Sequence, residues 1–303
     1  MQREFYERLV KIIDKESALL DEPMSKHTTF RIGGPSDYFV LPKSIEEVKN
    51  VTALCKEMKI PFYVLGNGSN LLVSDAGFRG VIIQIYKNMN RIEAEGDVIR
   101  AQAGALLSKI AGEALRNELT GFEFASGIPG TLGGAVVMNA GAYGGEMKDV
   151  LLEVTVLTGE GEVKVLKKEE LDLGYRTSVV SKKGYIALEA VIGLKKGNVE
   201  EIRTVMEDLK ERRTTKQPLE YPSAGSTFKR PEGYFAGKLI QDTGLRGFSV
   251  GGAQVSEKHC GFVINKDHAT AKDVVELMQE VSDRVEAKFG VPLEPEVKKL
   301  GDF

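Results

Sequence analysis

Three polar residues with potential for chemistry lie in short segments rich in turn-forming residues. They are Arg176 in GYRTS, Ser226 in PSAGSTF and Glu296 in LEPEVK. An arginine guanidinium is a permanently charged fork that suits a carboxylate or negative charge developing during a reaction. Turn formation alone would explain the serine, and a solvated surface would explain the arginine and the glutamate. Sequence periodicity does not bring the three together, so they are candidates and not yet a site.

Two glycine-rich segments predict where an anionic ligand binds. Residues 125–145, ASGIPGTLGGAVVMNAGAYGG, contain no Lys, Arg, Asp or Glu, and VLGNGSNLL over 64–72 is similarly uncharged. Glycine lets the backbone approach a ligand closely, so consecutive N–H groups can converge on a pyrophosphate, which indicates a dinucleotide cofactor. Tight turns and close packing are the alternative for either segment. GNGSNLL lacks the third glycine of G-x-G-x-x-G, and no P-loop sequence occurs, which disfavours both common nucleotide-binding units.

Charge and composition exclude several classes of protein. The formal net charge is -3 and basic residues are interleaved with acidic ones, so we expect no nucleic-acid partner. The first residues, MQREFYERLVKIIDKE, carry charges throughout, and no apolar run approaches 18 residues, so we expect a cytoplasmic chain with no membrane partner. Cys55 and Cys260 form no CxxC, and His27, His259 and His268 share no metal-ligand spacing, so we expect no metal site.

The patterning predicts a mixed α+β fold. A capping box at Ser44 and Glu47 begins a predicted helix, and Thr270 caps the closing one. Apolar spacing predicts helices over residues 5–13, 45–58, 106–115, 197–217, 236–245 and 271–289. Strands are predicted over 61–66, 80–85, 98–104, 185–194, 250–256 and 261–267, with a hairpin within 151–171 that turns around Gly159 and Gly161.

The two glycine-rich segments, GYRTS, PSAGSTFK and LEPEVK occur in an order that resembles the UDP-N-acetylenolpyruvoylglucosamine reductases of peptidoglycan synthesis. The resemblance spans nearly the whole chain. It implies a two-part FAD-binding domain without a Rossmann fold, of the vanillyl-alcohol-oxidase type, followed by a smaller α+β domain for a UDP-sugar enol ether. The expected domains are residues 1–87, 88–200 and 201–303. NADPH is the implied hydride donor, the substrate is a small molecule, and we expect a monomer.

The resemblance also implies roles for individual residues. Ser226 is the implied proton donor, and Arg176 and Glu296 assist at the same reaction centre. The implied cofactor-binding residues are Gly66, Asn67, Gly68, Ser69, Asn70, Leu71, Ser126, Gly127, Ile128, Pro129, Gly130, Thr131, Gly133, Gly134, Ala135, Asn139, Gly141 and Ala142. The candidates for substrate binding are Tyr175, Lys229, Lys238, Gln241 and Asn265.

Two features depart from the pattern of this family. Arg230 follows Phe228 and Lys229 where the family commonly has an asparagine, so a cation stands in place of an amide that contacts substrate. The connection from Arg176 to Ser226 has no room for a long extra loop, which is typical of the subgroup without an added tyrosine loop. Two alternatives remain from the sequence: a flavin alcohol oxidase on the same scaffold, and a nucleotide-binding regulator without a redox step.

Overall fold

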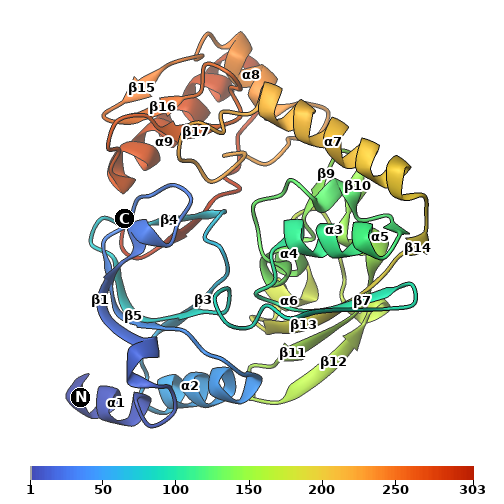
Figure 1. The fold of residues 1–303 in the computed structure, drawn as a ribbon. Coiled ribbons are helices and arrows are strands. Elements are labelled where there is room, and N and C mark those ends of the chain that lie inside the picture. Colours follow the sequence, from blue (N-terminus) through green and yellow to red (C-terminus); the bar gives the residue numbers. More distant parts are fainter. Residues whose placement is uncertain (1) are drawn as a thin grey trace. The chain divides into compact units, whose positions relative to one another are not determined.

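The computed structural model of the protein describes residues 2–303, which fall into two compact units (Figure 1). Unit 1 comprises the chain to Leu20, Tyr38–Asn67 and Gly80–Arg213. Unit 2 comprises Asp21–Asp37, Gly68–Arg79 and Thr214–Phe303. Each unit has a buried apolar core of its own.

The first part of unit 1 contains the helix predicted over residues 45–58 and the strands predicted over 61–66 and 80–85. Helix α2 begins after Ser44, whose side chain accepts a hydrogen bond from the Glu47 N–H at 3.1 Å, which confirms the Ser44 half of the predicted capping box. The Glu47 carboxylate accepts from the Lys43 N–H at 2.7 Å. Strand β3 runs parallel to β5, within a sheet of order β1-β2-β5-β3. The elements up to Gln84, of which η2 and β4 belong to unit 2, are α1 (Gln2–Leu9), η1 (Lys15–Ser17), β1 (Ala18–Pro23), η2 (Met24–Lys26), β2 (Pro35–Val40), α2 (Ile45–Glu57), β3 (Phe62–Leu65), β4 (Leu71–Val73) and β5 (Phe78–Gln84).

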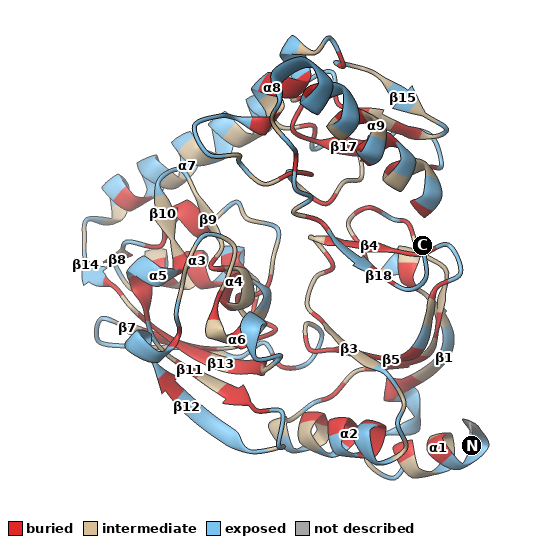
Figure 2. Ribbon diagram, turned by 180° about the vertical axis from the view of Figure 1, so that it is seen from behind, coloured by how far each residue is buried: buried red, intermediate tan, exposed pale blue. Residues whose placement is uncertain are grey.

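The second part of unit 1 is an antiparallel sheet of order β12-β11-β13-β7-β6, with α3 and α4 on one face (Figure 1). Figure 2 shows the central strands β11 and β13 largely buried and the edge strand β12 largely exposed. The predicted hairpin is confirmed, because Leu157 pairs with Val163. The elements are β6 (Ile92–Glu95), β7 (Val98–Gln102), α3 (Leu107–Arg116), β8 (Leu119–Thr120), η3 (Glu123–Ala125), α4 (Leu132–Met138), β9 (Gly141–Ala142), β10 (Gly145–Glu146), α5 (Met147–Val150), β11 (Leu151–Leu157), β12 (Val163–Lys167), η4 (Lys168–Glu170), α6 (Val179–Lys182), β13 (Ile186–Gly193), β14 (Lys195–Lys196) and α7 (Val199–Lys216).

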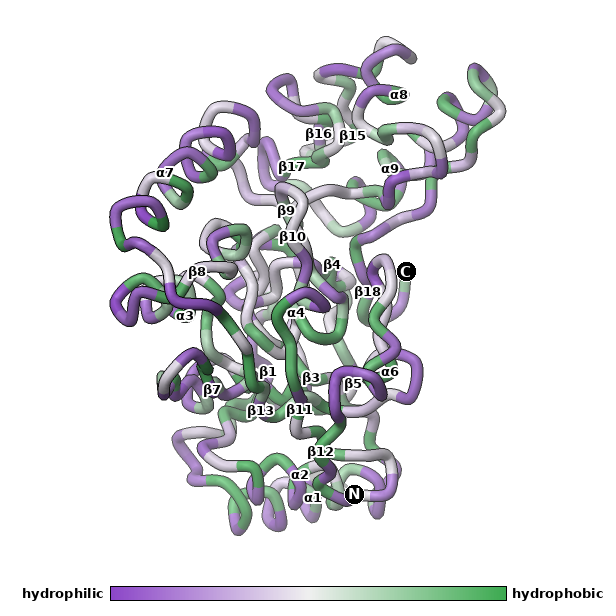
Figure 3. The backbone as a smooth tube through the Cα atoms, turned by 90° about the vertical axis from the view of Figure 1, so that its right-hand side faces the viewer, coloured by the Kyte–Doolittle hydropathy of each residue, from purple (hydrophilic) through white to green (hydrophobic). Residues whose placement is uncertain are grey.

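Helix α7 differs from the other long helix in its surface. Figure 3 shows α7 as hydrophilic along most of its length, and Ile202 is its one buried residue. Helix propensity and charged neighbours therefore support α7 more than core packing does.

Unit 2 has a core formed by α8, α9 and a small antiparallel sheet of order β15-β16-β17. Thr270 caps the start of α9, as predicted, and forms a reciprocal capping box with Asp273, while Gly290 ends the helix at φ 67°. Strand β18 pairs in parallel with β4, which joins the last residues of the chain to residues 71–73. The remaining elements are α8 (Ala236–Asp242), β15 (Ser249–Val250), β16 (Ala253–Val255), β17 (Val263–Asn265), α9 (Ala271–Phe289) and β18 (Lys298–Leu300).

Candidate functional site

The two glycine-rich segments meet inside unit 1. Strand β3 ends at Leu65, and a Cβ added to the next residue, Gly66, would lie 2.3 Å from the Thr131 Oγ1. The Asn67 Nδ2 donates a hydrogen bond to the Pro129 carbonyl at 2.8 Å. Gly66 is therefore required for close packing, and Asn67 fixes the second segment relative to the first.

Main-chain hydrogen bonds attach the backbone of the second segment to residues 103–107. The N–H groups of Leu132 and Gly133 donate to the carbonyls of Ala105 and Ala103, each at 2.8 Å. A Cβ at Gly133 would lie 3.0 Å from the Ala103 Cβ, so this glycine also serves packing. Gly134 is different, because the nearest atom to an added Cβ is the Thr131 Oγ1 at 3.8 Å. Its backbone therefore faces open space, which fits the close approach of a dinucleotide.

A cation that the sequence did not single out lies against this uncharged segment. A Cβ added to Gly127 would lie 2.9 Å from the Arg213 Nη1 near the end of α7. Burial lowers the pKa of Arg213 from its ordinary value, yet a guanidinium stays protonated at neutral pH. Arg213 stands in a run of charged residues, and nothing in that run distinguishes it from its neighbours.

The last part of the second segment follows the cradle, which is the glycine-rich backbone of residues 66–71 and 126–135. Asn139 caps the end of α4 in the left-handed conformation, with φ 42° and ψ 56°. Gly141 and Ala142 form β9, which pairs with β10. A Cβ at Gly141 would lie 2.6 Å from the Gly145 carbonyl oxygen, so this glycine is needed for the tight hairpin.

The remainder of the first segment belongs to unit 2. Gly68 has φ 63°, and a Cβ there would lie 2.1 Å from the His27 carbonyl oxygen. The Asn70 Nδ2 donates to the Glu296 carbonyl at 3.2 Å, and Leu71 pairs with Lys298. The sequence predicts GNGSNLL as one continuous ligand-binding segment. The structure places its residues up to Asn67 in unit 1 and those from Gly68 onward in unit 2.

Arg176 occupies a constrained turn in unit 1. The Gly174 N–H donates to the Thr177 carbonyl at 3.1 Å, and the Thr177 N–H donates to the Gly174 carbonyl at 3.3 Å. Arg176 has φ 55°, a left-handed conformation that a side chain other than glycine or asparagine rarely adopts. Its guanidinium carbon lies 5.1 Å from the centre of the exposed Tyr175 ring, within the range of a cation–π contact.

Ser226 and Glu296 are brought together in unit 2. Phe228 bridges to Pro295 in antiparallel fashion, and the Glu296 N–H donates to the Thr227 carbonyl at 2.8 Å. Thr227 is buried, and its Oγ1 accepts from the Val263 N–H at 2.8 Å. Ser226 therefore carries an exposed hydroxyl next to Thr227, whose position these hydrogen bonds fix. The half-buried Glu296 lies on the adjacent segment.

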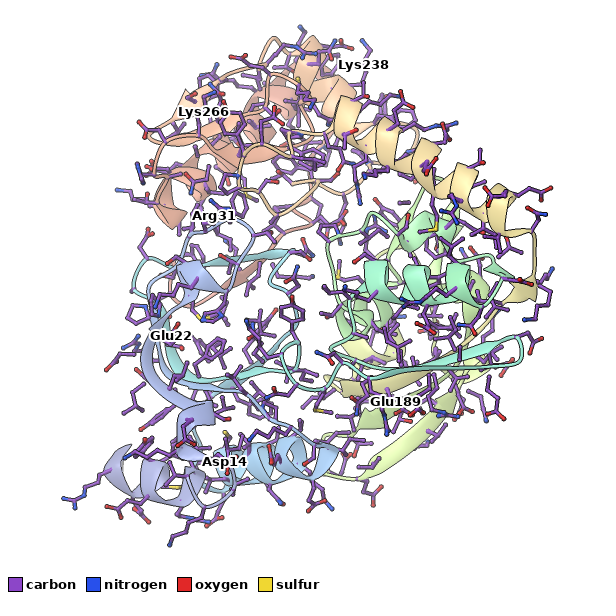
Figure 4. The ribbon with its side chains drawn as sticks, in the orientation of Figure 1. Asp14, Glu22, Arg31, Glu189, Lys238 and Lys266 are labelled. Atoms are coloured by element: carbon purple, nitrogen blue, oxygen red, sulfur yellow. The ribbon has the colours of Figure 1, made fainter. Side chains whose placement is uncertain are left out.

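The structure gives internal partners to most of the substrate-binding candidates. Lys229 pairs with Glu294, and the exposed Lys238 on α8, labelled in Figure 4, lies 2.5 Å from the Asp242 carboxylate. Gln241 accepts from the Arg246 Nη2 at 2.8 Å. Asn265 donates to the Phe30 carbonyl at 3.1 Å and accepts from the Ala269 N–H at 2.8 Å. A ligand would have to exchange these contacts or use the remaining hydrogen-bonding capacity of each side chain.

Among residues 2–303, no group of three or more His, Cys, Asp or Glu side chains is arranged to hold a metal ion. Over the same residues, no helix combines the length and apolar character needed to cross a bilayer.

Comparison with known families gives two matches. The family described as UDP-N-acetylenolpyruvoylglucosamine reductase, C-terminal domain, matches residues 217–300. The family described as FAD binding domain matches residues 36–167.

Curated relatives match over nearly the full length. The UDP-N-acetylenolpyruvoylglucosamine reductase of Alkaliphilus oremlandii is 55% identical over 297 residues, or 98% of each chain. That of Clostridioides difficile is 55% identical over 300 residues, or 99% of each chain.

Solved structures extend the comparison. The UDP-N-acetylenolpyruvylglucosamine reductase of Thermus caldophilus is 37% identical, with a TM-score of 0.80 over 94% of this chain and 98% of that one. The glucose dehydrogenase Phl p 4.0202 matches 65% of this chain with a TM-score of 0.52 at 13% identity, a likeness of fold alone.

Proposed function

The chain belongs to the family of UDP-N-acetylenolpyruvoylglucosamine reductases, and from this premise we propose that Arg176, Ser226 and Glu296 perform the chemistry of the reaction. The protein is an FAD-dependent oxidoreductase that uses NADPH to reduce UDP-N-acetylglucosamine enolpyruvate to UDP-N-acetylmuramate in peptidoglycan synthesis. The predicted fold class, a non-Rossmann FAD-binding domain followed by a smaller α+β domain, is confirmed. Family membership decides against the alcohol oxidase and the binding regulator.

The glycine-rich residues are proposed to hold the FAD. The chemistry that bound FAD supplies is hydride transfer, first from NADPH and then to the methylene carbon of the enolpyruvyl group. The open backbone at Gly134 supports a close approach of the cofactor, and Arg213 beside Gly127 adds positive charge that suits a diphosphate. We assign cofactor binding to residues 66–71, 126–131 and 133–135, with Gly141, Ala142 and the backbone of Asn139 as further candidates, since the Asn139 side chain already has hydrogen-bond partners.

Arg176 is proposed to stabilise negative charge on the substrate. Addition of hydride to the methylene carbon pushes electrons toward the carboxylate and gives an enolate-like species. A fixed guanidinium near that carboxylate lowers the energy of the developing charge. The left-handed backbone of Arg176 supports this role, because strained non-glycine residues persist where the surrounding structure enforces them and often occur at functional sites.

Ser226 is proposed to deliver the proton that completes the reduction. The enolate-like species needs a proton on the carbon next to its carboxylate, and a hydroxyl within hydrogen-bond reach can supply it. A serine hydroxyl is a weak acid, so the transfer depends on a strongly basic acceptor and fixed geometry. The anchored neighbour Thr227 supports such geometry, and the adjacent Glu296 is proposed to polarise the same centre.

Substrate binding is proposed for Tyr175, Lys229, Lys238, Gln241 and Asn265. The exposed Tyr175 ring offers an apolar face, and the lysines offer charge for the diphosphate. At the position of the usual asparagine, the Arg230 Nε donates to the Tyr234 carbonyl at 3.2 Å, and its guanidinium carbon lies 3.9 Å from the Phe235 ring centre. These contacts restrain the guanidinium, which is then proposed to meet the diphosphate.

The test separates the two half-reactions of one enzyme. Under anaerobic conditions the flavin spectrum is bleached with NADPH, and UDP-N-acetylglucosamine enolpyruvate is then added. We expect Ser226→Ala to bleach at the wild-type rate and to recover its oxidised spectrum at least about 10²-fold more slowly, because positioned proton transfer contributes about 10²–10⁴-fold.

Ser223→Ala is the matched control, since it makes the same change three residues earlier in the same segment and lies outside the proposed site. The control should follow wild type in both steps. Equal losses in bleaching and recovery for Ser226→Ala would refute its role as proton donor.

We propose further that the enzyme acts as a cytoplasmic monomer with domains at 1–87, 88–200 and 201–303. NADPH and UDP-sugar precursors are cytoplasmic metabolites, which supports the location. Light scattering coupled to size-exclusion chromatography tests the monomer, and cell fractionation tests the location. A mass of twice 33.2 kDa would refute the monomer.

A further inference from the structure

The turn that carries Arg176 is attached to the end of α4 by a buried amide. The Asn139 side chain is 1% exposed, and its Nδ2 donates to the Gly174 carbonyl at 3.0 Å and to the Glu146 Oε2 at 2.7 Å. Its Oδ1 accepts from the Lys148 N–H at 2.9 Å. Both amide hydrogens therefore point at oxygen acceptors and the amide oxygen points at an N–H donor, an arrangement that the flipped amide could not satisfy.

A second hydrogen bond holds the other side of the same turn. Ser178 is fully buried, and its Oγ donates to the Val137 carbonyl at 2.9 Å. Hydrogen bonds with Asn139 and Val137, both at the C-terminal end of α4, thus hold the turn before and after Arg176. Because Arg176 holds a left-handed φ of 55°, the turn needs such external support to persist.

Helix α4 connects this support to the proposed cofactor cradle. It runs from Leu132 to Met138, includes the open backbone of Gly134 in its first turn, and is followed by Asn139 as its C-cap. A helix of this length is a rigid spacer, so the position of Gly174 is tied through Asn139 to the segment assigned to the cofactor.

We propose that Asn139 is a positioning residue that holds the Arg176 turn at a fixed place relative to the FAD cradle. The proposal rests on the proposed role of Arg176. It differs from a direct cofactor contact, because both amide hydrogens of Asn139 and its oxygen already have partners within unit 1.

Asn139→Gly is the informative variant. Glycine keeps the left-handed backbone at φ 42° without strain and removes only the amide. We expect normal FAD content and normal bleaching by NADPH, together with a loss in the rate of substrate reduction on the order of 10²-fold, as a misplacement of about 1 Å can produce. The KM for the substrate should change much less than kcat.

A double-mutant cycle identifies the residue through which Asn139 acts. Arg176→Ala removes the guanidinium, and alanine bears a penalty for left-handed backbone similar to that of arginine. If Asn139 acts by positioning Arg176, the double variant Asn139→Gly/Arg176→Ala should reduce substrate no more slowly than Arg176→Ala alone. Losses that multiply in the double variant would overturn the proposal.

Two further comparisons keep the outcome decisive. Asn117→Gly removes an amide at the C-terminal end of α3 in the same unit, where it donates to the Glu113 carbonyl at 2.9 Å, and should leave both half-reactions unchanged. If Asn139→Gly does not fold, Asn139→Ser removes the amide, adds no charge beside Glu146 and keeps a hydroxyl that can accept from the Lys148 N–H, and the same selective loss is expected.

The remaining outcomes are distinguishable. Weaker FAD binding by Asn139→Gly, or equal loss in both half-reactions, would overturn the positioning role. Wild-type substrate reduction by Arg176→Ala would instead refute the proposed role of Arg176 and leave the contacts of Asn139 as structural support only.

Discussion

Gly134→Ala distinguishes the effect of a methyl group on the stability of the folded chain from its effect on the affinity for FAD. Gly134 lies in the first turn of α4, it is exposed, and an added Cβ would meet no atom closer than the Thr131 Oγ1 at 3.8 Å. The protein without ligand therefore has room for a methyl group. Alanine also favours the helix over glycine, so the apo protein should keep its stability or gain up to about 1 kcal/mol.

The bound cofactor should give the opposite result. If the FAD approaches the backbone at Gly134, the methyl group occupies part of that space and forces one of the two to move. Overpacking of this kind costs about 1–3 kcal/mol, which corresponds to an increase of about 5- to 150-fold in the dissociation constant of FAD.

The assay measures both quantities on the same preparation. Thermal unfolding of the deflavinated protein reports stability, and quenching of flavin fluorescence on titration reports affinity. Gly112→Ala in α3 is the matched control, since a Cβ there meets nothing within 4 Å and the site lies outside the glycine-rich segments. Wild-type FAD affinity in Gly134→Ala would refute a close approach of the cofactor at this residue, and a destabilised apo protein would refute the open space.

Two further predictions concern stability. Burial raises the pKa of the Cys55 thiol to about 12, so its contribution to stability is complete below the ordinary thiol value of about 8.5 and is lost as the pH rises toward 12. In a Cys260→Ala background, a thiol reagent at pH 8 should label Cys55 only after unfolding, and fast labelling of native protein would contradict this. Thr270→Ala removes the N-cap of α9, where the Thr270 Oγ1 accepts from the Asp273 N–H at 3.0 Å. Urea unfolding should show a loss of about 1 kcal/mol, and an unchanged midpoint would show that the cap contributes nothing.

Local signals in the sequence predicted the elements well because their physical causes are local. Ser44 and Thr270 each bond an N–H three residues ahead, so a short stretch of sequence contains both partners. Gly290 ends α9 for an equally local reason, the left-handed backbone at the helix end. Hairpin and helix positions followed from the same short-range patterns.

The reasons for individual glycines were not predictable, because they depend on distant residues. Gly66 is required by Thr131, whereas Gly134 meets no close neighbour, yet both look alike in sequence. Asn67 and Pro129, which tie the two segments together, are 62 positions apart. A run of glycines can thus indicate close approach, but only the fold distinguishes approach by the chain from approach by a ligand.

Buried polar residues in the loops account for the geometry that the sequence left open. A buried polar group is costly unless it is hydrogen-bonded, so each one restrains the backbone that supplies its partner. Ser178 and Thr227 are at most 1% exposed, and they stand two residues after Arg176 and one after Ser226. Both bond to a main-chain group far away in sequence. The reactive side chains can remain accessible while their neighbours fix the backbone. Buried, hydrogen-bonded polar residues beside exposed candidates, such as Ser178 and Thr227, therefore indicate where the backbone of a site is held in place.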